Sequence, residues 1–192
     1  MWIAYYGRGY GSFIVNNGGT LGGKTDVGVG VLLGGGEPGE SGTGIFKVIG
    51  DGGTVNADNF WVYDTSEVIF ELDDTGISPI NVGNLLKVQY GATGAKLTVD
   101  TSALKGQQTV DLFNYGSLSG TFGTVQVLGS ELVPGNGTDP GTYYLDYGNG
   151  KVTLTYNNPE DEEVIPEPAS AVLVFLGLGA VASRLRRRLP IS

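Results

Sequence analysis

Short runs in which apolar and polar residues alternate recur along residues 7–158. In one of them, Val152, Leu154 and Tyr156 share one face of an extended chain. Thr153 and Thr155 share the other face, and this period of two is typical of a strand buried on one side. The runs return about every 8–15 residues, separated by glycine-containing turns, and no helical pattern precedes residue 169. The pattern predicts an all-β domain.

The spacing of these runs favours a solenoid. Residues 11–23, 42–55 and 56–74 have the form of successive coils, each with a strand, a glycine turn and a second strand. Stacked coils bury a continuous apolar column and expose polar turns, which explains the heavy use of Gly, Asn, Asp and Thr. A β-sandwich is the alternative, because its short strands and glycine turns produce a similar pattern.

Residues 84–158 resemble the C-terminal end of the right-handed β-helix passengers of autotransporter-type surface proteins. The resemblance is carried by a strand at Leu112, Phe113 and Tyr115, a turn at Gly120 and Phe122 into 124–127, and a hairpin over 143–155 that turns at Gly148-Asn149-Gly150. It implies a right-handed parallel β-helix, with coils over residues 1–83 and a C-terminal β cap over residues 84–156. A cap of this kind would cover the unpaired edge of the last coil.

The amino-acid composition limits the kinds of functional site that the chain can contain. The chain has 34 glycines in 192 residues and neither cysteine nor histidine. Glycine at this level, well above the typical share of about 7%, suits turns between strands. The missing residue types exclude disulfides, thiolate metal sites, cysteine nucleophiles and histidine bases. Up to Glu167 there are seven basic and 20 acidic residues, and a body this acidic argues against binding to nucleic acid.

Three elements follow one another at the C-terminus. Pro166-Glu167-Pro168 predicts an extended, exposed segment, because two prolines restrict the backbone and remove donors. Residues 169–183 form an uncharged apolar run, which as a helix would be about 22 Å long, short of the roughly 30 Å hydrocarbon core. A basic cluster follows and would stay on the cytoplasmic side of a membrane; it consists of Arg184, Arg186, Arg187 and Arg188.

This order of elements resembles the PEP-CTERM sorting domain of Gram-negative bacteria, over residues 166–188. The resemblance implies a single C-terminal hydrophobic helix that holds the protein transiently in the inner membrane. It further implies an exosortase-type membrane enzyme as partner, cleavage near Pro-Glu-Pro, and delivery to the cell surface or extracellular matrix. The departures are Ile165, where the family often has valine, and the residues 189–192 after the arginines.

Two neighbouring segments complete this interpretation. Residues 157–165 include four consecutive acids, 160–163, whose repulsion favours an extended linker in front of the signal. The first eleven residues, MWIAYYGRGYG, lack the basic and apolar regions of a signal peptide. Either the start of the sequence is misassigned, or residues 1–83 are the end of a longer repeat region. We expect the second, because the chain from Tyr6 onward already has the pattern of a repeated β structure.

Carboxylates are the acid–base groups that remain. Asp73 and Asp74 follow the strand-like run 68–72, and glycoside hydrolysis would need two carboxyls about 5–10 Å apart across a cleft. Adjacent acids before Thr75 and Gly76 are more typical of a turn. Pairs considered as oxygen ligands for a hard cation are Asp51 with Asp58 and Asp139 with Asp146. Turn roles explain these as well, and we predict no catalytic residue, no metal site and no cofactor.

Aromatic residues are candidates for contact with sugars. Trp61 and Tyr63 would share a strand face, and Tyr143, Tyr144 and Tyr147 lie close to a turn. Core packing explains the same residues equally well. The hypothesis that follows is a non-enzymatic surface or matrix protein, with exopolysaccharide as a further candidate partner. The alternatives are a carbohydrate-binding module and the C-terminal fragment of a polysaccharide-degrading β-helix enzyme.

Overall fold

The computed structural model describes residues 1–3, 10–16, 18–22, 26–29, 43–64, 66–88, 94–129 and 132–159, without the side chains of residues 2 and 3. All of them belong to one compact unit, Met1–Glu160. The predicted sorting signal at Pro166, Glu167, Pro168, Arg184 and Arg186–Arg188 lies outside the described residues. So do the apolar run 169–183 and the acidic part of the linker.

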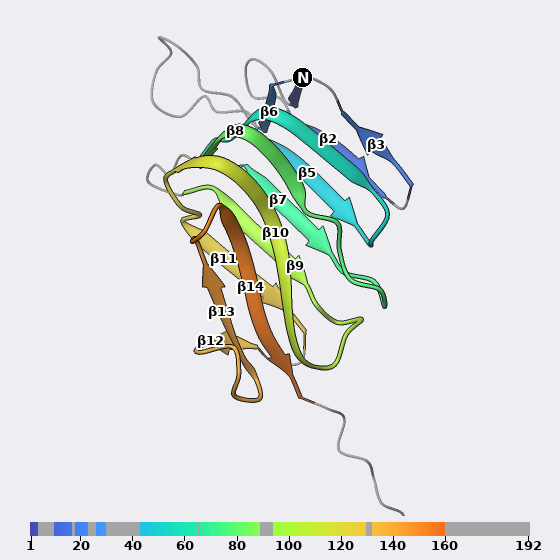
Figure 1. Cartoon of the computed structure of the whole chain (residues 1–192), viewed down its shortest axis with the longest axis vertical. Helices are drawn as coiled ribbons and strands as arrows, with labels where there is room; N and C mark the ends of the chain where they lie inside the picture. Colours follow the sequence, from blue (N-terminus) through green and yellow to red (C-terminus); the bar gives the residue numbers. More distant parts are fainter. Residues whose placement is uncertain are drawn as a thin grey trace, which may run out of the picture. The chain divides into compact units, whose positions relative to one another are not determined.

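The described residues form strands and turns and contain no helix, which confirms the all-β prediction (Figure 1). The strands belong to two sheets, here called sheet A and sheet B. Sheet A has the order β1 (Trp2–Ile3), β4 (Val27–Val29), β6 (Thr54–Val62), β8 (Ile80–Val88), β10 (Gly106–Ser119), β14 (Lys151–Asn158), β13 (Thr142–Asp146) and β12 (Val133–Pro134), with β3 (Thr20–Leu21) also paired to β6. Sheet B has the order β11 (Thr124–Leu128), β9 (Lys96–Asp100), β7 (Glu67–Glu71), β5 (Thr43–Ile49) and β2 (Tyr10–Val15).

The chain alternates between the sheets and stacks each strand on its counterpart from the preceding coil. β5, β7, β9 and β11 pair in parallel in sheet B, and β6, β8 and β10 pair in parallel in sheet A. Three successive coils, β5–β6, β7–β8 and β9–β10, therefore form a β-solenoid. Parallel stacking of this kind differs from the antiparallel Greek-key pairing of a β-sandwich.

The pairing changes at the C-terminal side of sheet A. β14 runs antiparallel to β10, and β13 runs antiparallel to β14. Their connection is the hairpin predicted at Gly148-Asn149-Gly150, where Asn149 and Gly150 have φ values of 55° and 74° and the Lys151 amide donates to the Gly148 carbonyl. Successive positive φ values are those of a type I′ turn. Residue 84, where the cap was expected to begin, lies within β8, and parallel pairing continues to β11.

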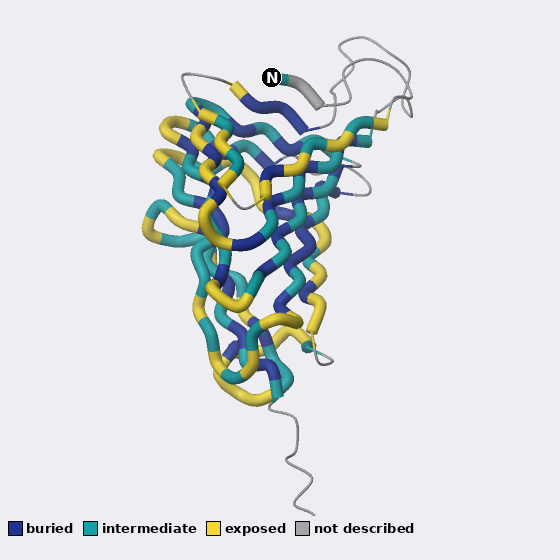
Figure 2. The backbone as a smooth tube through the Cα atoms, turned by 90° about the vertical axis from the view of Figure 1, so that its right-hand side faces the viewer, coloured by how far each residue is buried: buried dark blue, intermediate teal, exposed yellow. Residues whose placement is uncertain are grey.

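Phenylalanine rings form a column between the sheets. Phe46, Phe60, Phe70 and Phe113 are fully buried. Phe113 lies 5.3 Å from Phe70 and 5.9 Å from Phe60 between ring centroids, in edge-to-face arrangements that aromatic rings prefer. Buried and exposed positions alternate along the strands (Figure 2). In β14 the three predicted core residues, 152, 154 and 156, are all fully buried, which confirms the face predicted for them.

Three neighbouring strands of sheet A bend at the same level. The register shifts between Ala57 and Asn59 in β6 and between Tyr115 and Ser117 in β10, and both shifts lie opposite Gly83 and Asn84 of β8. Bulges of this kind bend a strand and increase its twist. Gly116 lies so close to the next strand that a Cβ there would be 2.6 Å from the Gly83 carbonyl oxygen. The residues just before the bend in β6 and β8, Ala57 and Val82, are buried in the core.

A buried asparagine fixes the end of β14 to the last full coil. The side-chain nitrogen of Asn158 donates to the backbone carbonyls of Thr101 and Leu104, at 2.7 and 2.6 Å. Thr101 in turn donates through its hydroxyl to the Leu128 carbonyl. Asn158 is 1% exposed, so water does not replace these contacts. The side chain therefore joins the turn after β9 to the final strand.

Replacing Asn158 by alanine is expected to lower the free energy of unfolding by about 2–3 kcal/mol, because two buried carbonyls lose their donor. Asn157→Ala is the matched control, since the neighbouring amide donates to the Thr138 carbonyl at an exposed position and should contribute below about 1 kcal/mol. Urea denaturation of both variants measures the difference. Equal losses for the two variants would contradict a structural role specific to Asn158.

Candidate functional site

Asp73, one of the acidic residues considered for chemistry, is used in a turn. The Asp73 carboxylate accepts hydrogen bonds from the amides of Thr75 and Gly76 at 2.9 and 3.1 Å, and from the Thr75 hydroxyl. This is the Asx-type turn that the sequence favoured over a catalytic pair. The second carboxylate oxygen accepts from the Asp51 amide of the preceding coil, at 3.2 Å. Asp73 thus connects the turns of two adjacent coils.

The pairs considered as cation ligands are not brought together. Asp51 accepts from the Ser78 hydroxyl at 2.8 Å, whereas Asp58 lies at the bend of β6, at least four strand residues away, or about 13 Å. Asp139 accepts from Asn136 before β13 begins, and Asp146 is the last residue of β13. Among the described residues, no group of three or more acidic side chains is placed to hold a metal ion.

The tyrosines near the hairpin point in different directions. Tyr143 is buried and its hydroxyl donates to the Val125 carbonyl at 3.4 Å, while the Phe122 amide donates to the Tyr147 hydroxyl at 3.3 Å. Burial raises the pKa of both phenols. These two side chains therefore lie against β11, the edge strand of sheet B, and the turn before it. Tyr144 points outward and is 51% exposed, so the three residues form no common platform for a sugar.

The other aromatic pair lies on sheet A. Trp61 is in β6 opposite Lys87 of β8, and Tyr63 follows the end of the strand. Both are partly buried, and burial raises the pKa of Tyr63. The sequence predicts a shared strand face, but only Trp61 lies within the strand, because β6 ends one residue before Tyr63.

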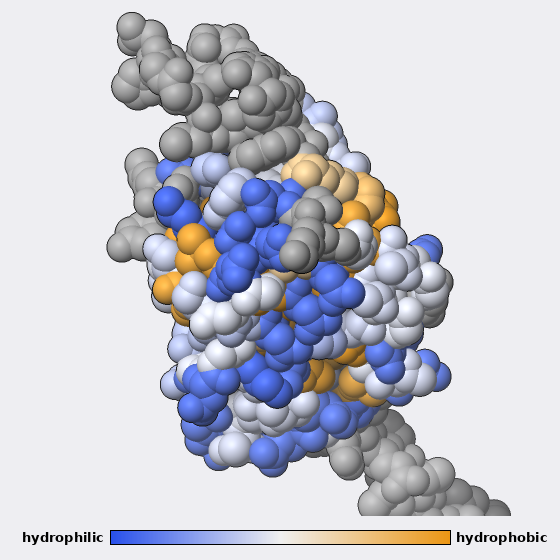
Figure 3. Space-filling model, turned by 45° about the horizontal axis from the view of Figure 1, so that its top comes forward, coloured by the Kyte–Doolittle hydropathy of each residue, from blue (hydrophilic) through white to orange (hydrophobic). Residues whose placement is uncertain are grey.

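Asparagine side chains form a ladder across the outer surface of sheet A. Asn56, Asn81 and Asn114 occupy equivalent positions on β6, β8 and β10. The Asn81 side-chain nitrogen donates to the Asn56 side-chain oxygen at 3.1 Å. The Asn114 side-chain nitrogen donates to the Asn81 side-chain oxygen at 2.8 Å. Figure 3 shows a hydrophilic band down the middle of the face in view. Hydrogen-bonded amides at matching positions hold neighbouring coils in register.

The ladder ends at Asn114. Lys151 occupies the matching position on β14, but its ammonium group forms an ion pair with Asp111. The Asn114 side-chain oxygen consequently has no hydrogen-bond partner, and it has almost no solvent exposure. A buried acceptor without a donor is unfavourable, and most buried polar groups in native proteins are paired.

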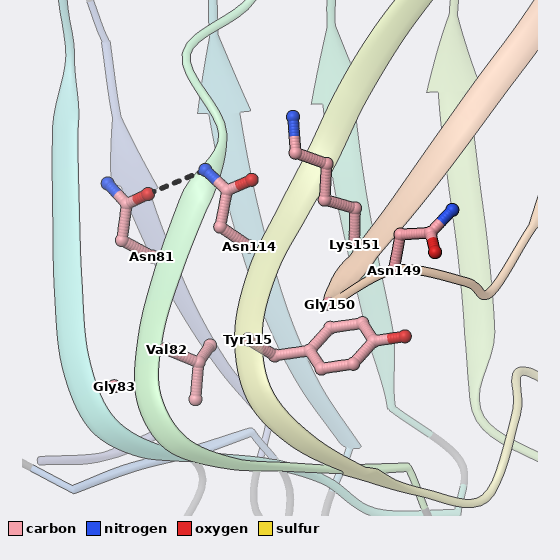
Figure 4. A pocket seen from close by; sticks show the side chains of 8 residues that line it. All are labelled: Asn81, Val82, Gly83, Asn114, Tyr115, Asn149, Gly150 and Lys151. Carbon is pink, nitrogen blue, oxygen red and sulfur yellow. Dashed lines mark hydrogen bonds between the residues drawn. The ribbon is translucent and has the colours of Figure 1, made fainter.

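An open hollow of about 380 Å³ lies at this end of the ladder (Figure 4). It is lined by Asn81, Val82, Gly83, Asn114, Tyr115, Asn149, Gly150 and Lys151. Three elements meet there: β8, β10 at its bend, and the hairpin before β14. The Tyr115 amide donates to the Gly150 carbonyl at 2.7 Å, which holds the hairpin against β10. Gly83 and Gly150 have no side chains, and this leaves the space open.

The hollow has a mainly apolar lining with a few polar groups, and it is nearly neutral in charge. Lys151 is balanced by Asp111, which also accepts from the Thr153 hydroxyl at 3.0 Å. Burial raises the pKa of Tyr115, and the negative charge of Asp146 raises it further. The phenol therefore stays protonated at neutral pH. The site is lined by one tyrosine ring with its hydroxyl, by three asparagine side chains, and by one lysine whose charge is paired with a carboxylate.

This site is not predicted by any local pattern in the sequence. Asn56, Asn81 and Asn114 are 25 and 33 residues apart, so no local motif joins them. A weak signal was present, because Asn56-Ala57-Asp58, Asn81-Val82-Gly83 and Asn114-Tyr115-Gly116 each place an asparagine two residues before a glycine or an aspartate. Recognising it requires the coil boundaries, because only these show that the three positions align.

Comparisons with known proteins assign no relationship. No family model, curated protein or solved structure matches the chain. Within the part of the chain that the structure describes, no helix has the length and apolar character needed to cross a bilayer.

Proposed function

We propose that this chain is a non-enzymatic protein of the bacterial cell surface or extracellular matrix, delivered there by its C-terminal signal. The observation that carries the proposal is the order of Pro166-Glu167-Pro168, the apolar run 169–183 and the terminal arginine cluster. An exosortase-type enzyme would recognise the signal while the apolar run lies in the inner membrane. Cleavage near Pro-Glu-Pro would then release the body.

The fold is consistent with this role in one respect. β14 ends at Asn158, eight residues before Pro166, and its end is fixed by buried hydrogen bonds. The signal therefore follows the last described strand after a short linker in the sequence. We further propose that the coils wind in the right-handed sense, which parallel strand connections favour, and that β13 and β14 act as the cap of the solenoid.

The proposal is tested by following the C-terminus of the protein. The chain is expressed behind a signal peptide in a host with an exosortase, alongside a variant with Pro166→Ala, Glu167→Ala and Pro168→Ala. We expect the wild-type protein to lose its C-terminal segment and leave the inner membrane, and the variant to remain there uncleaved. Intact mass and fractionation measure both properties.

A second variant controls for the loss of charge and proline in this region. It carries Pro159→Ala and Glu160→Ala, and it should be processed like the wild-type protein. Identical mass and location for the wild-type protein and the Pro-Glu-Pro variant would overturn the sorting proposal.

A further inference from the structure

We infer that the hollow beside Tyr115 binds a sugar unit of a neutral polysaccharide. This inference goes beyond the proposed surface location, because it assigns a ligand class to residues that the sorting signal does not involve. The site lies on sheet A between β8, β10 and the hairpin before β14 (Figure 4). Its volume of about 380 Å³ lies within the usual range of about 300–1,000 Å³ for small-ligand sites.

The aromatic ring supplies the first part of the argument. Tyr115 lines the hollow and is held in place through its backbone bond to Gly150. It is the tyrosine of this region that lies in a depression, whereas Tyr144 is exposed on β13. A fixed ring with an apolar face and a polar hydroxyl suits a sugar, whose ring has C–H groups on its faces and hydroxyls around its edge.

The polar groups define the class of ligand. The side-chain amides of Asn81 and Asn114 already form hydrogen bonds within the ladder. The Asn149 side chain carries both a donor and an acceptor, and a sugar hydroxyl has the same dual character. An anion accepts only, so it would leave the Asn149 oxygen without a donor. The Lys151 charge is already balanced by Asp111, and the seven basic residues up to Glu167 are outnumbered by 20 acidic ones. A neutral glycan therefore fits better than a charged one.

The side chain of Asn114 forms part of the wall of the hollow at the end of the ladder. Its nitrogen donates to Asn81, and its oxygen has no hydrogen-bond partner and almost no solvent exposure. Asn114 therefore shapes the hollow, and Tyr115 and Asn149 are the residues expected to contact a bound sugar.

Titration calorimetry on the full chain in mild detergent tests the inference. The probes are cellohexaose, maltohexaose, laminarihexaose and mannohexaose, with hexagalacturonate as the anionic counterpart. We expect at least one neutral probe to bind with a Kd below about 1 mM. Tyr115→Ala should weaken that binding at least tenfold, whereas Tyr144→Ala should leave it unchanged.

A second variant protects the test against loss of folding. Asn149 has a positive φ of 55°, which glycine adopts more readily, so Asn149→Gly keeps the hairpin and removes only the amide. It should weaken binding about threefold with an unchanged melting temperature. The inference is overturned if no neutral probe binds, if only hexagalacturonate binds, or if Tyr115→Ala and Asn149→Gly both bind like the wild-type protein. The measurement needs no exosortase, so its outcome is separate from that of the sorting experiment.

Discussion

Replacing Phe113 by alanine is expected to lower the free energy of unfolding by about 4 kcal/mol. Phe113 is fully buried and contacts rings from both sheets, with centroid distances of 5.9 Å to Phe60, 5.3 Å to Phe70 and 6.0 Å to Phe122. Removing it takes away apolar burial and leaves a cavity bordered by three aromatic rings. Rigid strands on either side prevent the core from closing around that cavity.

Urea denaturation of the full chain measures this effect, with Phe13→Ala as the control. Phe13 is partly buried on β2 and contacts Phe46 at 5.6 Å, so its loss should cost about half as much. A larger loss for Phe13→Ala than for Phe113→Ala would contradict the central position of Phe113 in the core.

Replacing Gly120 by alanine is expected to destabilise the domain by at least about 3 kcal/mol. Gly120 has a φ of 81°, and a Cβ there would lie 1.8 Å from the Val88 carbonyl oxygen. A backbone atom cannot rotate away as a side chain can. The turn between β10 and β11 would have to move, and it would disturb the pairing on both sides.

Gly141→Ala provides a closely matched control. Gly141 has a φ of 77°, and no atom lies within 4 Å of its added Cβ, so only the backbone strain of about 1–2 kcal/mol remains. Comparing the melting temperatures of the two variants separates the cost of backbone strain from the cost of the steric clash. Equal losses would show that the close approach of Gly120 to Val88 has no energetic importance.

The local features of the fold were predictable from the sequence. The core face of β14 follows from strict alternation, because a strand has a period of two. The hairpin follows from Gly148-Asn149-Gly150, which supplies the residues that tolerate positive φ. Asp73 behaves as a turn residue for an equally local reason, since its acceptors reach amides two and three residues ahead. Each of these needs only neighbouring residues.

The arrangement of the site was not predictable in the same way. The asparagine ladder depends on the alignment of β6, β8 and β10, whose connections differ in length, so the repeat has no constant period. Tyr143 and Tyr147 contact the edge of sheet B rather than one another, which depends on how the hairpin lies against β11. The position of the hollow depends on the same long-range packing.

The two kinds of pairing in the fold have a consequence for the order of folding. In the hairpin, Asp146 pairs with Thr153, only seven residues away, whereas Ile45 pairs with Glu67 and Ile80 pairs with Phe113. Short loops close faster than long ones, and a hairpin can form in about 1–10 μs. Because each coil contacts only its neighbours, the hairpin and β10 are expected to nucleate the domain, and coils would then add toward the N-terminus. The solenoid would thus assemble in the direction opposite to its synthesis on the ribosome.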